Sequence, residues 1–399
     1  AEVEVPAGDV DGPDSKPDIP LHEPLPERDL LAYVNPFIGT DGPGNVIPGV
    51  LVPHGMVKLS PDTVQDIDDL GGYDYDTSEI AGFSHTHLEG PGGSRYGYSQ
   101  VQVMPVRAVD DVLGPARHST YSHEAESASP GVYEVALPEI EARVDLAATA
   151  HCGITRIHYE GDHDLPRALV LDATHTRGRS LGGHLEVVGD DSLEGFGVAA
   201  LQPMIQELMK GKAPGTGERT LFFHMQVSQA FTSFATWQDT ELVPERREVD
   251  GDDVGAWLRF EGQGTPGEAF VLEARVCISG IDVETARASR EAELDGRSFE
   301  DIQGAAAAEW NTVLNRIPVD KGAGDDEPMA GLDEDQLIAF YTALYHAHFQ
   351  PTDVSERGRH WIGASGTGEV VETKGAGFYV DDFCMWDTFR TSHPLHILT

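Results

Sequence analysis

Two histidines separated by one residue, His85 and His87, open the stretch of this chain that is richest in potential chemistry. Glu89, a Gly-Pro-Gly-Gly turn and Arg95 follow them, with two tyrosines close to the arginine. Glycines let a backbone approach a ligand closely, and a loop rich in donors and poor in aliphatic side chains suits a polyhydroxylated ligand. Residues 71–98 are therefore a candidate sugar-binding element. The alternative is a plain hairpin whose histidines bond only to their neighbours.

The spacing of the two histidines also admits a metal site. If residues 83–88 form a strand, the period of two places His85 and His87 on one face, where imidazoles can share an ion. A third ligand would come from elsewhere, for example His54 or Asp62. We favour sugar contact or structural hydrogen bonds over metal binding.

An acidic cluster precedes the histidines, but it lacks the spacing of a calcium-binding loop, whose glycine and closing glutamate are absent. A solvated loop is favoured there, and bound calcium is a secondary expectation. The cluster consists of Asp66, Asp68, Asp69, Asp74 and Asp76.

A second constellation lies near the last residue, where Trp386, Asp387 and Arg390 fall within one turn of an expected helix start. An indole can stack on the apolar face of a sugar while a carboxylate and a guanidinium bind pairs of hydroxyls. The alternative is a helix cap in which Asp387 bonds its own backbone and Arg390 pairs locally.

Composition excludes some classes of partner. The 399 residues include 68 acidic and 27 basic side chains, for a formal net charge of −41. Such a charge repels nucleic acid and anionic membranes, and no run of about 18 apolar residues is present to span a bilayer. Three widely spaced cysteines allow at most one disulfide. The Pro-rich, acidic segment at residues 1–28 is typical of a mature, secreted N-terminus left by signal-peptide removal.

Hydrophobic periodicity predicts strands first and helices afterwards, which favours an all-β domain followed by a distinct α domain. Strands with alternating or buried patterns are expected at residues 98–105, 131–137, 154–159, 168–173, 221–227, 256–260 and 269–279. Helices are expected at residues 283–293, 299–317 and 332–350, the last capped by Asp333, and a further apolar helix begins near 387. So few helices would be poorly buried, so the helical domain is expected to be incomplete here.

Seven motifs together give the chain a resemblance to glycoside hydrolase family 92. They are VNPFIGT (34–40), PG (48–49), VPxGM (52–56), LSPDT (59–63), GYxY (72–75), GFSHTHL (82–88) and WDTFRxxHPL (386–395). The resemblance covers residues 30–399. It implies a calcium-dependent, inverting exo-α-mannosidase with an N-terminal β-sandwich, a helical linker and a C-terminal (α/α)6 barrel, and an active site between the domains.

Mapped onto this chain, the resemblance implies a tail at residues 1–28, a β-sandwich at 29–281, a helical linker at 282–330 and the first part of the barrel at 331–399. The rest of the barrel would follow as a continuing or separate chain. Trp386 and Asp387 would hold a terminal mannose, with Asp62 and Arg390 beside it. The loop from His85 to Arg95 would border the leaving group. The general acid, the general base and most calcium ligands would lie beyond Thr399, so no catalytic residue and no metal ligand is assigned here.

One departure from the family pattern concerns the leaving group. Many members have Cys and Asp where this chain has Gly93 and Arg95. A guanidinium beside a glycine-rich turn favours an anionic leaving group, which suggests cleavage of mannose-1-phospho-6-mannose caps. The alternative is that Arg95 pairs with a surface acid.

Three function classes follow from these observations. The first is a secreted exo-α-mannosidase acting on mannans or N-glycans. The second is a non-catalytic carbohydrate-binding β-sandwich. The third is a metal hydrolase built on His85 and His87.

Overall fold

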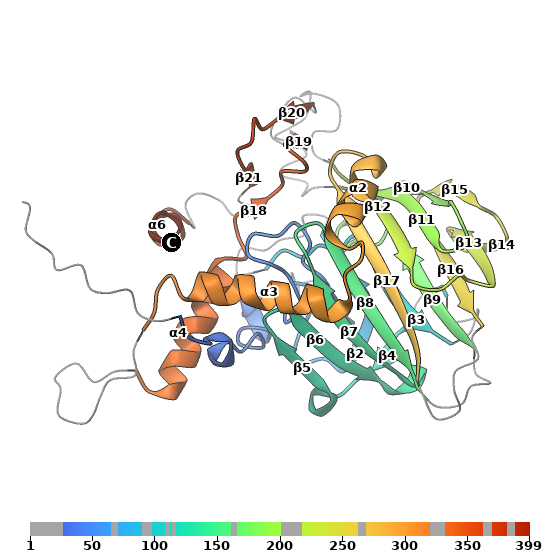
Figure 1. Ribbon diagram of the computed structural model, residues 1–399. Coiled ribbons are helices and arrows are strands. Elements are labelled where there is room, and N and C mark those ends of the chain that lie inside the picture. Colours follow the sequence, from blue (N-terminus) through green and yellow to red (C-terminus); the bar gives the residue numbers. More distant parts are fainter. Residues whose placement is uncertain are drawn as a thin grey trace, which may run out of the picture.

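The computed structural model describes residues 27–64, 71–89, 98–107, 112–113, 117–160, 166–200, 218–261, 269–319, 332–361, 369–380 and 388–399. Figure 1 shows two broad sheets that lie against each other, with two small two-stranded sheets at the top of the view and the C-terminal helix at its left.

The first sheet is antiparallel and, within the described residues, has eight strands in the order β1-β2-β3-β9-β16-β13-β14, with β4 paired to β2. Their bounds are β1 (Ser60–Thr63), β2 (Glu79–Ser84), β3 (Gln102–Val106), β4 (Ser119–Thr120), β9 (Arg167–Asp172), β13 (Ser233–Gln238), β14 (Glu241–Pro244) and β16 (Val254–Phe260).

The second sheet, also antiparallel, has nine strands among the described residues, in the order β15-β10-β11-β12-β17-β8-β7-β6-β5. Their bounds are β5 (Glu126–Ser129), β6 (Val132–Leu137), β7 (Ala142–Ala148), β8 (Cys152–Tyr159), β10 (Arg179–Val187), β11 (Ser192–Ala200), β12 (Glu218–Val227), β15 (Glu248–Gly251) and β17 (Phe270–Ser279).

One hydrophobic core fills the space between the two sheets. It joins Phe83 and Leu171 of the first sheet to Tyr133, Phe223 and Leu272 of the second. The alternating side chains of β17 follow the predicted pattern, since Phe270, Leu272, Ala274, Val276 and Ile278 are all buried. The expectation of a β-rich sandwich is confirmed.

The predicted strand at residues 83–88 is wrong in its bounds, because β2 ends at Ser84. Its partner segment explains the break: Ser99 and Val101 have φ angles of 60° and 57°, a left-handed conformation that interrupts a β-ladder. The His85 N–H donates to Gln100 O instead. The two histidines therefore lie in an irregular segment, and the period of two does not place them.

The helices form close to where their periodicity and caps predict them. They are α2 (Val283–Glu293), α3 (Phe299–Leu314), α4 (Glu334–Ala347) and α6 (Ser392–Leu398), with short 3-10 turns at Leu31–Tyr33, Gly42–Gly44, His123–Ala125 and Pro138–Ile140. The predicted cap Asp333 accepts from Gln336 N, and the Gln336 side chain accepts from Asp333 N in return. None of the described helices is both long and apolar enough to cross a membrane.

A second core fastens α3 and α4 to the segment that precedes β1. Trp310, Tyr341 and Tyr345 of the helices pack with Ile47 and Leu51. Trp310 Nε1 donates to Leu51 O over 2.7 Å, so the largest buried side chain of α3 is also hydrogen-bonded. Beyond α4, β18 (Thr352–Asp353) pairs with β21 (Tyr379–Val380), and β19 (Arg359–Trp361) pairs with β20 (Val370–Glu372). The expected boundaries at residues 281 and 330, and the assignment of the last segment to a barrel, stay predictions.

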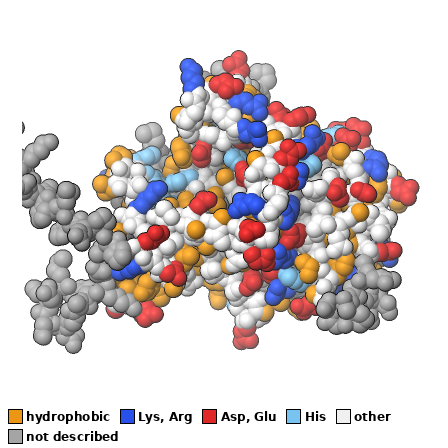
Figure 2. All heavy atoms as spheres, viewed as in Figure 1, with side chains coloured by type: hydrophobic (Ala, Val, Ile, Leu, Met, Phe, Trp, Pro, Cys, Tyr) orange, Lys and Arg blue, Asp and Glu red, His pale blue; other side chains and the backbone are white. Residues whose placement is uncertain are grey.

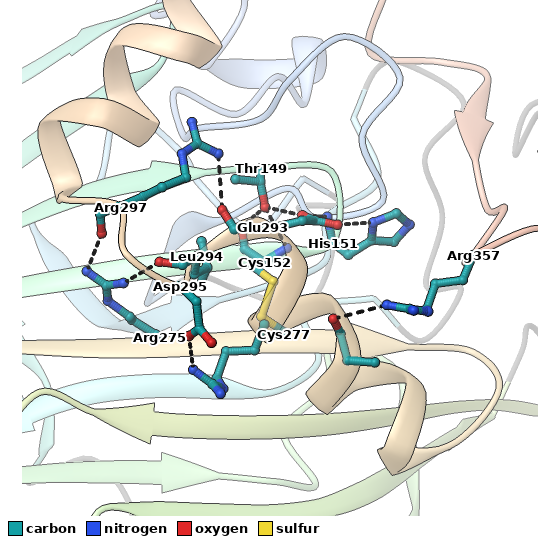
Figure 3. Close-up of a disulfide and its surroundings, with 12 residues drawn as sticks. Thr149, His151, Cys152, Arg275, Cys277, Glu293, Leu294, Asp295, Arg297 and Arg357 are labelled. Carbon is teal, nitrogen blue, oxygen red and sulfur yellow. Dashed lines mark hydrogen bonds and ion pairs between the residues drawn. A yellow bond between two sulfur atoms is a disulfide. The ribbon is translucent and has the colours of Figure 1, made fainter.

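A disulfide joins the neighbouring strands β8 and β17 through Cys152 and Cys277, which are direct cross-strand partners. Cys384 lies outside the described residues. Beside the disulfide, Glu293 at the end of α2 bonds His151 Nδ1 over 2.6 Å and also bonds the hydroxyl of Thr149 (Figure 3). These contacts fix the turn between α2 and α3 to the second sheet.

Removing the disulfide tests its contribution to stability. The double substitution Cys152→Ala and Cys277→Ala should lower the free energy of unfolding by about 2–4 kcal/mol, because the closed loop of 125 residues is then free in the unfolded chain. Urea unfolding measures the change. Cys384→Ala, which keeps both disulfide cysteines, controls for loss of a thiol. Unchanged unfolding of the double variant would contradict the prediction.

Candidate functional site

A buried carboxylate, Asp62 at β1, is the centre of the polar cluster that contains two of the predicted site residues. Ser84 Oγ and Gln102 Nε2 donate to its Oδ2 over 2.6 and 2.9 Å. His87 Nε2 lies 3.1 Å from its Oδ1, and His175 Nε2 lies 3.5 Å from its Oδ2. We call these five residues the Asp62 cluster.

The hydrogen bonds explain how a charge can stay buried at this place. Asp62 is only 2% exposed. Burial by itself raises the pKa of this carboxyl group, but the hydrogen bonds from His175 and His87 outweigh burial and hold the pKa well below its usual value. The carboxylate is therefore ionised, and its donors come from the ends of β2, β3 and β9.

The imidazole of His87 is held from both sides. Its Nδ1 donates to Lys58 O over 2.8 Å, and its Nε2 faces Asp62. The ring packs against Gly72, whose φ is +97° and where a Cβ would lie 2.7 Å from His87 Cδ2 and 2.8 Å from Asp62 Oδ1. Glycine is therefore required at residue 72, both for its backbone conformation and for space.

His85 points to a different environment. Its Nδ1 donates to Val101 O over 2.7 Å, and its ring lies over Gly153 of the second sheet, where a Cβ would be 2.8 Å from His85 Cδ2. Burial lowers the pKa of His85 to about 4, so the ring is neutral near pH 7. Within the described residues, neither His85 nor His87 joins a group of three metal-ligating side chains. The arrangement gives no support to a metal hydrolase built on this pair.

A buried ion pair continues the cluster toward the helices. Lys58 Nζ lies 3.0 Å from Glu89 Oε1, and both side chains are almost fully buried. Glu89 is also close enough to Tyr345 of α4 for its charge to add to burial in raising the pKa of that phenol. The last described residue before the glycine-rich stretch is thus paired with Lys58, just before β1, and its charge acts on Tyr345 of α4.

The cluster reaches the surface at His175, whose side chain is 22% exposed. In the turn after it, Thr176 Oγ1 and Arg177 N both donate to Tyr98 O over 3.0 Å, and the Arg219 guanidinium lies over the Tyr98 ring. Both ends of the stretch 90–97 are therefore anchored, at Glu89 and at Tyr98.

The structure brings Asp62 and His87 together. His85, two residues before His87 in the chain, lies in a separate environment. All three are buried, so their direct contact with a sugar stays a prediction. Arg390 is exposed, and its guanidinium lies 5.2 Å from the centre of its neighbour's ring, Phe389. Arg95, Trp386 and Asp387 lie outside the described residues, as do Asp66, Asp68 and Asp69 of the acidic cluster.

Three members of the Asp62 cluster were not expected from the sequence: Ser84, Gln102 and His175. A usable signal exists for His175, since it follows the buried strand β9 in the polar run Thr174 to Arg177. Ser84 and Gln102 lie opposite each other in the β2–β3 ladder. Only the register of that ladder shows that they share a partner.

Substitution of Gly72 tests the packing of this cluster. Gly72→Ala should lower the free energy of unfolding by about 1–3 kcal/mol more than Gly296→Ala does, because extra volume is forced against Asp62 and His87. Gly296 is the matched control, since its φ is also positive, at +73°, but a Cβ there meets nothing within 4 Å. Equal losses in the two variants would show that the space around residue 72 is not limiting.

The neutral His85 predicts acid sensitivity. Below its ordinary pKa of 6.5 the unfolded chain gains a proton at this position, whereas the folded chain resists protonation down to about pH 4. Stability should therefore fall as the pH falls through this window, on the order of 1 kcal/mol per pH unit. His85→Asn removes the titrating group, so the free energy of unfolding should decrease less between about pH 7 and about pH 5 in the variant than in the parent. Urea unfolding at each pH measures this.

Only the difference between the pH profiles of the parent and the variant isolates the effect of His85, because protonation of His151 changes the free energy of unfolding in the opposite direction. Burial lowers the pKa of His151, but the hydrogen bond that His151 donates to Glu293 outweighs burial and raises it. That pair stabilises the fold at low pH and its contribution is lost as the pH rises. Parallel pH profiles for the parent and His85→Asn would contradict the assignment of the acid loss to His85.

Comparison with known proteins gives the family. Residues 33–279 match the model of the glycosyl hydrolase family 92 N-terminal domain, and residues 285–399 match that of the family 92 catalytic domain. An uncharacterized secreted glycosidase of Arthroderma benhamiae is 23% identical over 387 residues, which is 91% of this chain and 46% of the relative.

Solved structures agree with the family match. A family 92 α-mannosidase of Bacteroides thetaiotaomicron, solved in complex with mannoimidazole, is 26% identical, with a TM-score of 0.78 over 92% of this chain and 46% of that one. A family 92 inverting mannosidase of the same organism is 25% identical, with a TM-score of 0.75 over 92% of this chain and 46% of that one. The chain thus spans about half the length of the relatives it matches, and on two domain models that together cover most of its residues it belongs to glycosyl hydrolase family 92.

Proposed function

We propose that the protein carrying this chain is an exo-acting α-mannosidase that inverts the configuration of the anomeric carbon. One observation carries the proposal: 92% of the chain superimposes, with a TM-score of 0.78, on an α-mannosidase solved with mannoimidazole. The similar structure of an enzyme named as an inverting mannosidase supports the stereochemistry. The substrates would be terminal α-mannosides of mannans or N-glycans.

The reaction would be a single displacement. A carboxylic acid protonates the leaving oxygen while a carboxylate activates water on the opposite face of the sugar, the two groups standing about 6.5–9.5 Å apart. We place that pair beyond Thr399. Within this chain, Trp386 and Asp387 would hold the terminal mannose, with Arg390 and Asp62 beside it.

The role of the Asp62 cluster in this proposal is to position a loop. Buried hydrogen bonds hold Asp62 and His87 in one arrangement, and the Lys58–Glu89 pair fixes the residue from which the stretch 90–97 begins. A loop anchored at both ends presents its backbone to a ligand at low entropic cost. That stretch would border the leaving group, with Arg95 facing it.

Calcium is part of the proposal as a cofactor of the complete enzyme, but the described residues do not fit it. Calcium prefers six to eight oxygen ligands, whereas Asp62 Oδ2 already accepts from Ser84 and Gln102. The two metal-competent groups found among the described residues consist of three histidines, or of one partly exposed histidine and two exposed acids. No step proposed here depends on the ion.

A finer proposal concerns the leaving group. Arg95 replaces the carboxylate expected from the family pattern, and a guanidinium pairs well with a phosphodiester. We propose that the enzyme also removes mannose from mannose-1-phospho-6-mannose caps. A phosphate leaving group needs little protonation, so this reaction would demand less of the general acid.

We also propose that the protein is secreted. The Cys152–Cys277 disulfide is typical of oxidising compartments, and a similar protein of Arthroderma benhamiae is described as a secreted glycosidase. An extracellular location would bring the enzyme to mannose-containing glycans.

Release of free mannose is the decisive measurement. The complete protein should release mannose from α-mannosides, with nuclear magnetic resonance showing the β-anomer first, as inversion requires. A chelator should abolish release and added calcium should restore it. Mannose binding without release would favour the alternative, a non-catalytic carbohydrate-binding β-sandwich.

The same assay tests the phosphodiester proposal. Arg95→Asp should lower the rate on mannose-1-phospho-6-mannose by about tenfold or more, the equivalent of losing one charge-assisted hydrogen bond. Its rate on an uncharged α-mannobioside should change little, which makes that substrate the control. Equal rates of Arg95→Asp and the parent on the phosphodiester would contradict the phosphodiester proposal and leave the mannosidase proposal unaffected.

A further inference from the structure

Three histidines from separate parts of the chain converge beside the second hydrophobic core. His54 lies in the loop before β1, His348 ends α4, and His396 lies on α6. One ring nitrogen of each lies within 4.8 Å of the ring nitrogens of the other two. We call this group the three-histidine cluster.

From this convergence we infer a transition-metal site of the zinc type. Three imidazoles bound to one tetrahedral zinc ion, with zinc–nitrogen bonds of about 2 Å, place their ring centres about 5 Å apart. The ring centres here are 5.6, 5.4 and 5.2 Å apart, and the rings are inclined to each other by 60°, 68° and 86°. The ring separations are therefore close to those of a zinc site, and the rings are not stacked.

The outer nitrogens of two members are already fixed in the way that metal-binding histidines usually are. His54 Nδ1 donates to Pro351 O over 2.9 Å, and His348 Nδ1 donates to Leu344 O over 2.8 Å. A carbonyl partner at Nδ1 sets the tautomer in which Nε2 carries a lone pair for the metal. His348 Nε2 also lies 3.3 Å from Thr399 Oγ1, but that hydroxyl donates to Leu395 O over 3.1 Å, which leaves the Nε2 lone pair available.

The backbone holds His54 in place for this role. Its φ is +60°, which is uncommon for a residue other than glycine and is found at sites where surrounding contacts impose it. Here the His54 N–H donates to His348 O over 3.1 Å, and Asp353 N donates to His54 O over 2.8 Å. The loop is thus bound to the end of α4 independently of any ion.

The donor set selects the class of metal. Imidazole nitrogens favour zinc and its neighbours in the transition series over calcium and magnesium, which favour oxygen. Two positive side chains, Arg316 and Lys58, act electrostatically on His54, and the charge of Lys58 is balanced by its ion pair with Glu89.

The cluster is open to solvent on one side. His348 is buried, while His54 and His396 are partly exposed. Figure 2 shows histidine side chains at the surface on the side of the molecule where α6 lies. A water molecule can therefore reach the fourth position of the ion.

The expected effect is to fasten α6 to the loop at His54 and to the end of α4. This role is independent of the proposed mannosidase activity and of calcium. Zinc should bind one ion per chain and raise the melting temperature of the complete protein, since a ligand that binds only the folded state stabilises it.

Zinc affinity, measured by competition with a chromogenic chelator, tests the site. His396→Gln, on a short surface helix, should weaken binding by more than about 100-fold, because loss of even an outer hydrogen-bond partner of a metal ligand typically costs about 10–100-fold. His184→Gln is the matched control. It breaks the other metal-competent group, formed with Glu248 and Asp250, and should leave the affinity unchanged.

X-ray absorption on the zinc-loaded parent keeps the test independent of how the variants fold. Three imidazoles at about 2.0–2.1 Å are expected around the ion. The proposal is overturned if the parent takes up no zinc at equimolar amounts, if oxygen atoms dominate the shell of the ion, or if His184→Gln and not His396→Gln abolishes binding.

Discussion

The buried charge of Asp62 is the constraint on which the candidate site depends. An ionised carboxylate removed from water is costly unless polar groups surround it. Here Ser84 and Gln102 donate to it, and the imidazoles of His87 and His175 face it. Each donor lies at the end of a strand or just beyond one. The carboxylate therefore requires these strand ends and their following segments to converge, and loss of the convergence would leave a buried charge without partners.

Lys58 extends the polar contacts of the Asp62 cluster toward the helices. Its carbonyl oxygen accepts from His87 Nδ1, while its ammonium group pairs with Glu89 in a buried site. Glu89 lies close to Tyr345, which packs in the core that α3 and α4 share with the segment before β1. A buried ion pair contributes little net stability but is costly to break on one side. It consequently fixes the segment after β2 against the segment before β1 more than it strengthens their contact.

Periodicity predicts the local elements of this chain well, because each strand and helix buries one face. The alternation of β17 and the capping residue Asp333 were both read from neighbouring residues and are both found. The placement of His85 and His87 failed because it assumed a regular ladder, which the left-handed residues Ser99 and Val101 interrupt. Such a break depends on the partner segment, and no property of residues 83–88 signals it.

The side chains of the Asp62 cluster and of the three-histidine cluster come from segments that are far apart in the sequence. Sequence patterns, which compare neighbouring residues, therefore did not group them. His54, Lys58 and Asp62 succeed one another at intervals of four residues, yet each is bound to a different partner: the end of α4, Glu89, and the strands β2 and β3. This one short segment therefore carries the contacts of both polar clusters. The nine residues from His54 to Asp62 are held at both ends by hydrogen bonds, at His54 to the end of α4 and at Asp62 to Ser84 and Gln102. The segment therefore has few conformations left to lose, and it places both clusters without an ion.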